Sequence, residues 1–350
     1  MTTRQELLEI PQALRQMSEE GRRAYDAIIR SASWSQRPVF MIGDGASYFA
    51  ALTGAWAFES LLGLPVIVRR PAVFSAYTRH AIAVHSLVIA ISSSSEGEET
   101  LQAVKNAKRH GAVVWVISPN PESELAELAD AVADCYAAES PAEGSRSVFC
   151  RHAATLFLAV AAAQVLKAPA PMLNTQEGEL GKLATNVEWI LNRISDAGSA
   201  LAKELGQLSD LYIVGGGSFH PVALQAASRL RQLAGVNASG FDLMHFQQDF
   251  RQISQPGAGI LYLSSSRCRL KEQAHRSVAE FRQMGGQKLF AVTDNNDRQL
   301  SQRSDLAVLL PGLTEAGGAL LTLAFLELAV SYASQDSTHA AALRRPASKG

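Results

Sequence analysis

Four consecutive serines, Ser92 to Ser95, are the feature of this sequence whose residue types best suit a ligand. They follow an apolar run, 87–91, that predicts a buried strand, and they precede a stretch of helical pattern, 96–110. Serine hydroxyls, backbone N–H groups and the positive end of a helix dipole meet in such a turn, and together they bind a phosphate monoester. A polar turn that only caps the helix is the alternative interpretation.

The two halves of the chain carry the same signals in the same order. In each half, one apolar run ends in a glycine turn and the next ends in serines. The glycine turns begin at Gly43 and Gly215, 172 residues apart, and the serines begin at Ser92 and Ser264, also 172 apart. A third pair of apolar runs ends at positions 118 and 293, which are 175 residues apart. This near-constant offset indicates a duplicated domain.

Within each half, apolar strands alternate with helical stretches such as 96–110 and 270–285. This alternation predicts an α/β fold in which a parallel sheet has helices on both faces. Ligands of such sheets bind at the carboxyl ends of the strands, so a site is expected in the loops after the apolar runs. The long apolar segments 153–165 and 319–330 are rich in alanine and are predicted to be buried helices rather than membrane spans.

Composition restricts the partners and the cofactors. The chain has 350 residues, 47% of them hydrophobic, which favours two domains over one. The 32 Lys and Arg residues nearly balance the 33 Asp and Glu residues, so the overall charge attracts neither nucleic acid nor an anionic membrane. Cys135, Cys150 and Cys268 lack the spacing of a zinc site and fit a reduced, cytoplasmic protein. We therefore expect no metal.

The glycine turns do not have the form of a nucleotide-binding motif. Tyr48 stands where the dinucleotide motif G-x-G-x-x-G needs its third glycine, and Phe219 and His220 follow the turn 215–218. The phosphate-binding motif G-x-x-x-x-G-K-[ST] does not occur in the sequence. A nicotinamide cofactor is therefore not expected, and we predict that the protein works without any cofactor.

Three segments resemble the SIS (sugar isomerase) domain family, which includes the isomerase half of glucosamine-6-phosphate synthase, SIS-type aminosugar-phosphate deaminases and fructosamine-phosphate deglycases. They are the turn Gly45-Ala46-Ser47-Tyr48 with Phe58-Glu59-Ser60 downstream, the loop 91–96, and the segment 215–224 with His220 and Pro221. The resemblance covers nearly the whole chain. It implies two tandem flavodoxin-like domains, each a three-layer αβα sandwich with a parallel sheet, and a homodimer in which neighbouring subunits complete each site.

In this family the loops of the first domain hold a sugar phosphate. By resemblance, the residues that bind it here are Gly45, Ala46, Ser47, Ser92, Ser93, Ser94, Gly97, Glu143 and Ser147. The family's Ser-x-Ser-Gly-Glu-Thr loop reads Ser-Ser-Ser-Ser-Glu-Gly, so a glycine and the last hydroxyl are replaced. A C-terminal lysine reaches the sugar in some relatives, and its counterpart is Arg345.

The second domain departs further from the family. The catalytic glutamate that moves a proton between C1 and C2 of the sugar corresponds to Gln232, and an amide cannot take up that proton. The family's Glu-x-x-His-Gly-Pro corresponds to 245–250, so Gln248 replaces the histidine that assists ring opening. His245 stands in the place of the glutamate, and Asp249 follows Gln248. These four residues are the candidate catalytic positions.

Two interpretations of the function remain open. In the first, the chain catalyses isomerisation, deamination or deglycation of an amino sugar or fructosamine 6-phosphate, with His245 and Asp249 as an acid/base pair that Asp242 orients. In the second, it is a non-catalytic phosphosugar sensor that retains the serine loop. Arg229 and Arg231 point to different helix faces, so at most one is expected to reach a site. The sequence does not name the sugar.

The signals also suggest how the chain is divided. We expect a helical N-terminal segment at 1–35, domains at 36–170 and 206–335, a linker with a connecting helix at 171–205, and a C-terminal tail at 336–350. The N-terminal segment is polar and lacks the charged-then-apolar order of a signal peptide.

Overall fold

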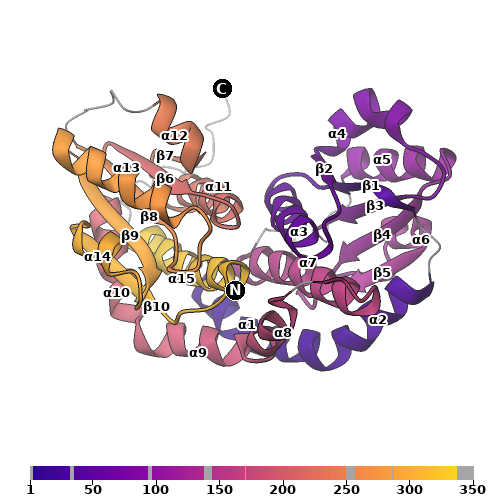
Figure 1. The fold of residues 1–350 in the computed structure, drawn as a ribbon, viewed down its shortest axis with the longest axis horizontal. Coiled ribbons are helices and arrows are strands. Elements are labelled where there is room, and N and C mark those ends of the chain that lie inside the picture. The colour runs from indigo at the N-terminus through magenta and orange to yellow at the C-terminus, as the bar shows by residue number, and fades with distance from the viewer. Residues whose placement is uncertain are drawn as a thin grey trace, which may run out of the picture. The chain divides into compact units, whose positions relative to one another are not determined.

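The chain folds as two α/β units in a computed structural model, which describes residues 3–31, 35–93, 97–137, 144–169, 171–249, 257–285 and 287–336. One unit consists of residues 9–184, and the other of residues 185–336 with residues 3–8. Each unit contains one five-stranded sheet whose strands pair in parallel. The duplicated α/β fold predicted from the repeat is confirmed (Figure 1).

The sheet of the first unit has the strand order β2-β1-β3-β4-β5. Its strands are β1 (Ser35–Ile42), β2 (Val66–Arg69), β3 (Ser86–Ile91), β4 (Val113–Ser118) and β5 (Ala131–Asp134). The helices around it are α1 (Thr3–Gln16), α2 (Arg22–Ser31), α3 (Ala46–Leu62), α4 (Pro71–Val73), α5 (Glu98–Arg109), α6 (Glu124–Leu128), α7 (Ser145–Val165) and α8 (Leu173–Gly181), with a π-helical turn at Met17–Gly21 and two further short turns at Phe74–Thr78 and Arg79–Ala81.

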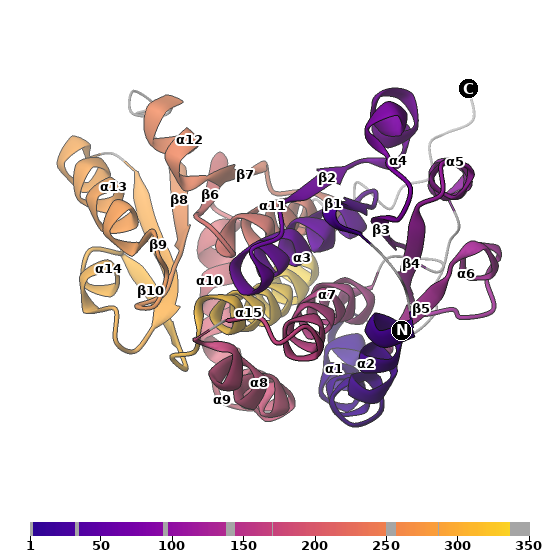
Figure 2. The same ribbon diagram turned by 45° about the vertical axis from the view of Figure 1, so that its right-hand side comes forward.

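Helices cover both faces of this sheet. Phe40 and Val88 pack on one face in a core cluster with side chains of α5. Met41, the neighbour of Phe40, points to the opposite face, where it lies against Gly54 of α3 and Thr155 of α7. Because both faces are covered, β3 is buried along its whole length, and this explains its uninterrupted apolar run. Figure 1 and Figure 2 both show α3 and α7 side by side on their face.

The two longest helices, α7 and α15 (Glu315–Asp336), are apolar on every side. Each is long and apolar enough to cross a membrane, yet 89% of the relevant stretch of each lies buried inside the protein. A helix that is apolar all round needs burial on all sides, and here the units themselves provide it. The prediction of buried helices at 153–165 and 319–330 is confirmed.

The segment predicted as one connecting helix is instead three helices, α8, α9 (Leu183–Arg193) and α10 (Ser195–Leu205). The backbone leaves the helical conformation at Lys182 and again at Ile194. Gly181 precedes the first break, but neither glycine nor proline marks the second. The helical periodicity continues through the break at Ile194, so the pattern alone did not reveal it.

The second unit repeats the topology, with the strand order β10-β9-β8-β6-β7. Its strands are β6 (Asp210–Gly215), β7 (Ala238–Asp242), β8 (Ala258–Leu263), β9 (Lys288–Asp294) and β10 (Leu306–Leu310). Its remaining helices are α11 (Phe219–Arg229), α12 (Leu243–Asp249), α13 (Lys271–Met284) and α14 (Arg298–Gln302), with a π-helical turn at Leu230–Ala234. One face of the sheet packs on α13 through a cluster that includes Tyr262, Val278 and Phe281.

Candidate functional site

The strand order of the first unit creates a topological switch point at the carboxyl ends of β1 and β3, and we refer to the space between the loops after these two strands as the crevice. From β1 the chain runs through α3 to β2 on one side, whereas from β3 it runs through α5 to β4 on the other. β1 and β3 are direct neighbours, with Ile42 paired to Ala90 near their carboxyl ends. The loops after these strands therefore diverge from a common point, and open α/β sheets bind ligands at such a switch point.

Two glycines shape the turn after β1. A Cβ on Gly43 would lie 2.6 Å from the backbone oxygen of Ser47, so no side chain fits there. Gly45 has a φ of 53° and a ψ of −128°, a conformation open mainly to glycine. α3 begins at Ala46, and Gly45 offers no side chain to cap its first N–H groups. The turn thus presents backbone donors and the positive end of a long helix.

Ser92 and Ser93 begin the loop after β3. Ser92 is buried, its N–H donates to the Ile117 carbonyl at 3.0 Å, and its hydroxyl donates to the Ser93 carbonyl at 2.7 Å. Gly97 precedes α5 and also makes no side-chain cap. The structure therefore brings Ser47, Ser92 and Ser93 to the two loops that flank the crevice.

Other predicted residues of this site are distributed as follows. Ser147 is buried in the first turn of α7, a helix whose N-terminal glycine again makes no side-chain cap. Ser94, Glu143 and Arg345 lie outside the described residues.

A buried arginine that the sequence analysis missed supports the turn after β1. Arg151 of α7 is 1% exposed. Its Nη1 donates to Ser47 Oγ at 2.6 Å, and its Nε donates to the Ser147 carbonyl at 3.1 Å. Because Ser47 Oγ accepts the arginine bond, its own proton is available to another acceptor. A signal existed, since a cation inside an apolar helix needs partners when it is buried.

The corresponding crevice of the second unit holds a protein carboxylate. β6 and β8 are neighbours there, and Gly215 pairs with Leu263. Glu315, the first residue of α15, accepts the Ser218 N–H with Oε1 at 3.1 Å and the Arg269 N–H with Oε2 at 3.0 Å. One carboxylate therefore joins the loops after both strands.

The four candidate catalytic residues all lie on the surface of the second unit. His245 Nε2 lies 3.1 Å from Asp249 Oδ2 on α12, and the two side chains are 59% and 57% exposed. The His245 ring stacks on Phe241 at an interplanar angle of 14°. Gln248 on the same helix and Gln232 on the π-helical turn are exposed. The pair exists as its spacing suggested, but it is open to solvent in the single chain.

Asp242 has a different role from the one expected. Its Oδ1 accepts the backbone N–H groups of Met244 at 2.9 Å and His245 at 3.3 Å, so the carboxylate caps α12 instead of bonding to the imidazole. Asp242 and His245 also influence the pKa of His220 on α11. Burial lowers the pKa of His220, His245 lowers it further, and Asp242 opposes both by raising it. Two histidines and Asp242 are thus close enough to influence one another.

The two arginines near Gln232 have partners within the unit. Arg229 is buried, and its Nε lies 3.2 Å from Oε2 of the equally buried Glu327 on α15. Arg231 donates to the Ala238 carbonyl. Neither contact involves a strand-end loop, so we assign neither arginine to a ligand site.

Comparison with known proteins gives a family match for one part of the chain. Residues 34–164 match the family described as SIS domain. Over 312 residues the chain is 25% identical to the glutamine–fructose-6-phosphate aminotransferase (isomerizing) of Thermococcus kodakarensis, a match that covers 89% of this chain and 51% of the relative. The corresponding enzyme of Mycobacterium tuberculosis is 31% identical over 208 residues, 58% of this chain and 32% of the relative. The chain spans about half the length of the curated relatives it matches.

Solved structures share the fold of the chain across both units. The C-terminal domain of glucosamine-fructose-6-phosphate aminotransferase from Francisella tularensis has a TM-score of 0.81 at 16% identity, covering 95% of each chain. The tagatose-6-phosphate ketose/aldose isomerase of Escherichia coli has a TM-score of 0.78 at 15% identity, covering 95% of this chain and 92% of that one. The predicted tandem arrangement of three-layer SIS folds is therefore confirmed.

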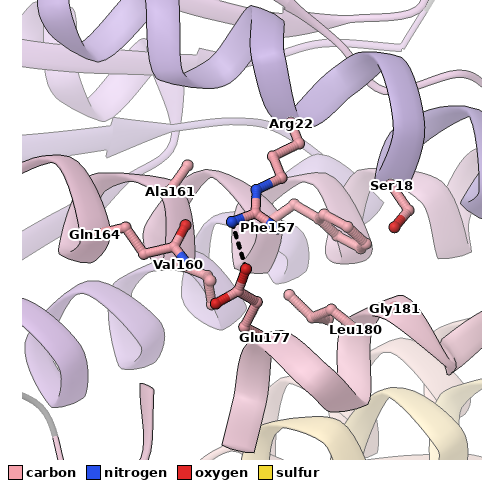
Figure 3. A pocket seen from close by; sticks show the side chains of 9 residues that line it. All are labelled: Ser18, Arg22, Phe157, Val160, Ala161, Gln164, Glu177, Leu180 and Gly181. Carbon is pink, nitrogen blue, oxygen red and sulfur yellow. Dashed lines mark ion pairs between the residues drawn. The ribbon is translucent and has the colours of Figure 1, made fainter. Parts of the chain in front are cut away.

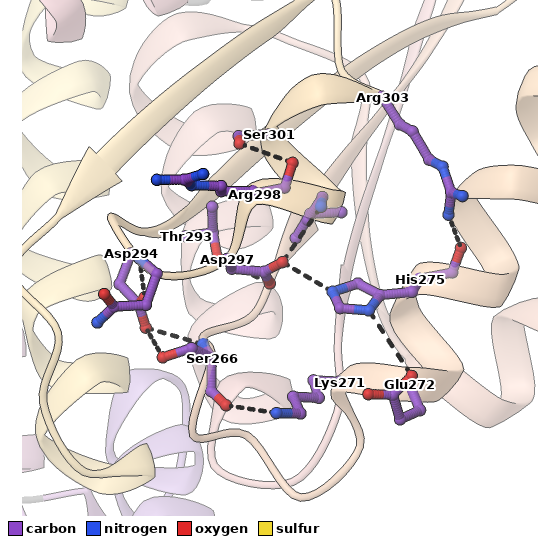
Figure 4. A network of polar contacts seen from close by, with 12 residues as sticks. Ser266, Lys271, Glu272, His275, Thr293, Asp294, Asp297, Arg298, Ser301 and Arg303 are labelled. Atoms are coloured by element: carbon purple, nitrogen blue, oxygen red, sulfur yellow. Dashed lines mark hydrogen bonds and ion pairs between the residues drawn. The ribbon is translucent and has the colours of Figure 1, made fainter.

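A second polar cluster, drawn in Figure 4, lies at the carboxyl ends of β8 and β9. Asp294 Oδ2 accepts the N–H and the hydroxyl of Ser266 at 2.8 and 2.9 Å. Asp297 Oδ1 lies 2.8 Å from His275 Nε2 and also accepts the N–H of Leu300, so Asp297 caps α14, which begins at Arg298. Both carboxylates bond to donors of their own unit, so this cluster fixes the loops after β8 and β9.

A cavity of about 70 Å³ lies in the first unit, and an ion pair between Arg22 and Glu177 crosses it (Figure 3). Residues of α2, α7 and α8 contribute to its wall, and no residue after a strand end lines it. It is therefore separate from the crevice. Among the described residues, no three His, Cys, Asp or Glu side chains are grouped so as to hold a metal ion.

Proposed function

We propose that the first domain binds a sugar phosphate in the crevice between the loops after β1 and β3. The observation that carries the proposal is the buried Ser47 hydroxyl at the start of α3, whose oxygen accepts a bond from the buried Arg151. The Ser47 hydroxyl proton, the N–H groups of Ala46 and Gly97, which have no acceptor among the described residues, and the guanidinium charge are the donors and the charge that a phosphate requires. Relatives named for fructose 6-phosphate and tagatose 6-phosphate support a sugar phosphate as the ligand class.

Thermal stability in the presence of hexose, hexosamine and fructosamine 6-phosphates tests this binding. We expect one class to raise the melting temperature of the protein, and Ser47→Ala combined with Ser92→Ala to abolish the rise. Ser60→Ala, at the far end of α3, is the matched control and should leave the effect unchanged. The proposal fails if the double variant is stabilised as much as the unaltered protein.

For the reaction, we propose a proton transfer beside a carbonyl or imine, as in isomerisation, deamination or deglycation of an amino sugar or fructosamine 6-phosphate. A base removes the proton from one carbon and the neighbouring carbon regains it, so no oxidant is consumed. The observation that favours catalysis is the contact of His245 with Asp249, in the electrostatic range of His220. Because the pair is more than half exposed, we also propose a homodimer in which the partner subunit covers it.

Product analysis separates an enzyme from a sensor. We expect turnover of a phosphosugar that binds, and a strong loss of turnover in His245→Ala, whereas His110→Ala on the exposed end of α5 should have no effect. Gln232→Glu should raise isomerase activity if the remaining groups of the site are intact. Binding without turnover of any compound of the panel would favour the non-catalytic phosphosugar sensor.

We propose a reducing cytoplasm as the place of action. Cys135, Cys150 and Cys268 are free and buried. Burial raises the pKa of Cys135 and of Cys268 to about 11, so both thiols stay protonated and unreactive at neutral pH.

A further inference from the structure

The internal repeat relates the contacts of Glu315 to the proposed phosphate site. Ser218 and Arg269, whose N–H groups donate to Glu315, stand 172 residues after Ala46 and Gly97. The same offset joins the glycine turns and the serine loops of the two halves. α3 begins at Ala46, and α5 begins directly after Gly97. The carboxylate therefore bonds to the two backbone positions that the repeat pairs with Ala46 and Gly97, which flank the proposed phosphate site of the other domain.

In the described part of the chain, the two domains differ in the acceptors of these N–H groups. Among the residues that the structure describes, the N–H groups of Ala46 and Gly97 have no protein acceptor. In the second domain both equivalents donate to the two oxygens of one carboxylate, at 3.1 and 3.0 Å. An anion held by N–H groups of two loops at a switch point is the arrangement expected of a bound phosphate.

We propose that Glu315 is a built-in anion that occupies the ligand crevice of the second domain, so that each chain binds a single sugar phosphate, in the first domain. This inference rests on the proposed function of the first crevice. The turn after β6 is shaped for the carboxylate, because Gly217 has a φ of 57° and a Cβ there would collide with Glu315 Oε1. The bond also fixes the start of α15 against both loops.

The proposal predicts what happens when the carboxylate is removed. Glu315→Gly removes the charge and vacates the space, so we expect inorganic phosphate to enter and the chain to bind two phosphates instead of one. Glu315→Gln removes the charge but keeps the volume. We therefore expect both variants to melt at a lower temperature, and phosphate to restore stability to Glu315→Gly and not to Glu315→Gln.

The measurement is made in two backgrounds so that the two proposals are judged separately. Calorimetric titration with phosphate counts the sites, and melting temperature reports rescue. Ser47→Ala and Ser92→Ala disable the first crevice. Any phosphate that a chain with these two changes and Glu315→Gly binds therefore belongs to the second domain. Glu272→Ala, an exposed acidic residue of the same domain, is the matched control and should create no site.

The outcomes are distinct. The built-in anion is refuted if Glu315→Gly, in the chain that carries both serine changes, neither binds phosphate nor gains stability from it. It is also refuted if that variant fails to fold even with phosphate present. If instead the unaltered chain binds no phosphate, or the serine changes leave its binding intact, the proposed function fails. The offset of 172 also pairs Glu315 with Glu143, which lies outside the described residues. The number of phosphates that the unaltered chain binds therefore tests whether the first crevice is open to a phosphate.

Discussion

Replacement of Arg151 by methionine tests the support beneath the proposed phosphate site. Methionine has nearly the length of the arginine stem and fills the same buried space without the guanidinium. The change deletes the bond of 2.6 Å to Ser47 Oγ and the positive charge beside the turn after β1. It leaves Ser47, the glycines and the start of α3 in place. Binding of a phosphate should therefore fall, although no group that contacts it directly has been removed.

The size of the effect follows from the kind of bond that is lost. A hydrogen bond that involves a charged group contributes about 1.5–3 kcal/mol. If that energy serves to orient the Ser47 hydroxyl toward the ligand, the loss corresponds to a dissociation constant raised roughly 10- to 150-fold. Methionine buries no unpaired charge, but it leaves the buried Ser47 Oγ without the arginine donor, and a buried polar group that loses its partner costs about 1–3 kcal/mol. We therefore expect the free energy of unfolding to fall by about 1–3 kcal/mol.

Isothermal titration with fructose 6-phosphate and urea denaturation of the same samples measure the two quantities. Arg146→Met is the matched control, because Arg146 lies on the same helix but pairs with Glu9 at 2.8 Å instead of contacting Ser47. We expect the control to bind normally. An Arg151→Met protein that keeps its fold and its affinity would refute the reasoning, as would a loss of affinity equal in both variants.

Three further predictions concern stability. Burial lowers the pKa of His220 in the folded chain below its usual 6.5, so the unfolded chain takes up the proton more readily. The free energy of unfolding should therefore be constant above pH 6.5 and decline as the pH falls through the folded pKa. Urea denaturation across this pH range should show a weaker decline for His220→Gln. Glu327→Gln leaves the buried Arg229 without its ionic partner and should lower the free energy of unfolding by about 3–5 kcal/mol. A decrease of less than about 1 kcal/mol would contradict the buried pair. A Cβ at Gly45 or at Gly178 meets no atom within 4 Å, yet only Gly45 has a positive φ, of 53°. Gly45→Ala should therefore destabilise by about 1–3 kcal/mol, while Gly178→Ala within α8 should stabilise slightly; equal effects would refute the role of backbone conformation.

The central strands could be predicted from the sequence because they are buried on both faces. Their apolar runs and the glycine turns after β1 and β6 needed no tertiary information, and neither did the apolar helices α7 and α15. The edge strands β2, β5, β7 and β10 were not predicted. They have four or five residues each and are partly exposed, and polar residues or glycine interrupt β5 and β7. β10 is an unbroken apolar run, Leu306–Leu310, so this strand could have been predicted.

Part of the candidate site could likewise be predicted from the sequence, and part depends on the tertiary structure. The spacing of His245 and Asp249 places them one helical turn apart, so their contact was readable from the chain. The serine loop and its position at a strand end were also visible. The bond from Arg151 to Ser47 joins residues 104 positions apart, and the bond from Ser218 to Glu315 joins residues 97 apart. Periodicity reports whether a side chain is buried, and local spacing reports its neighbours within a helix. Which distant donor meets a given oxygen is decided only when the sheets and helices pack, and here that packing places the Glu315 carboxylate between the loops after β6 and β8.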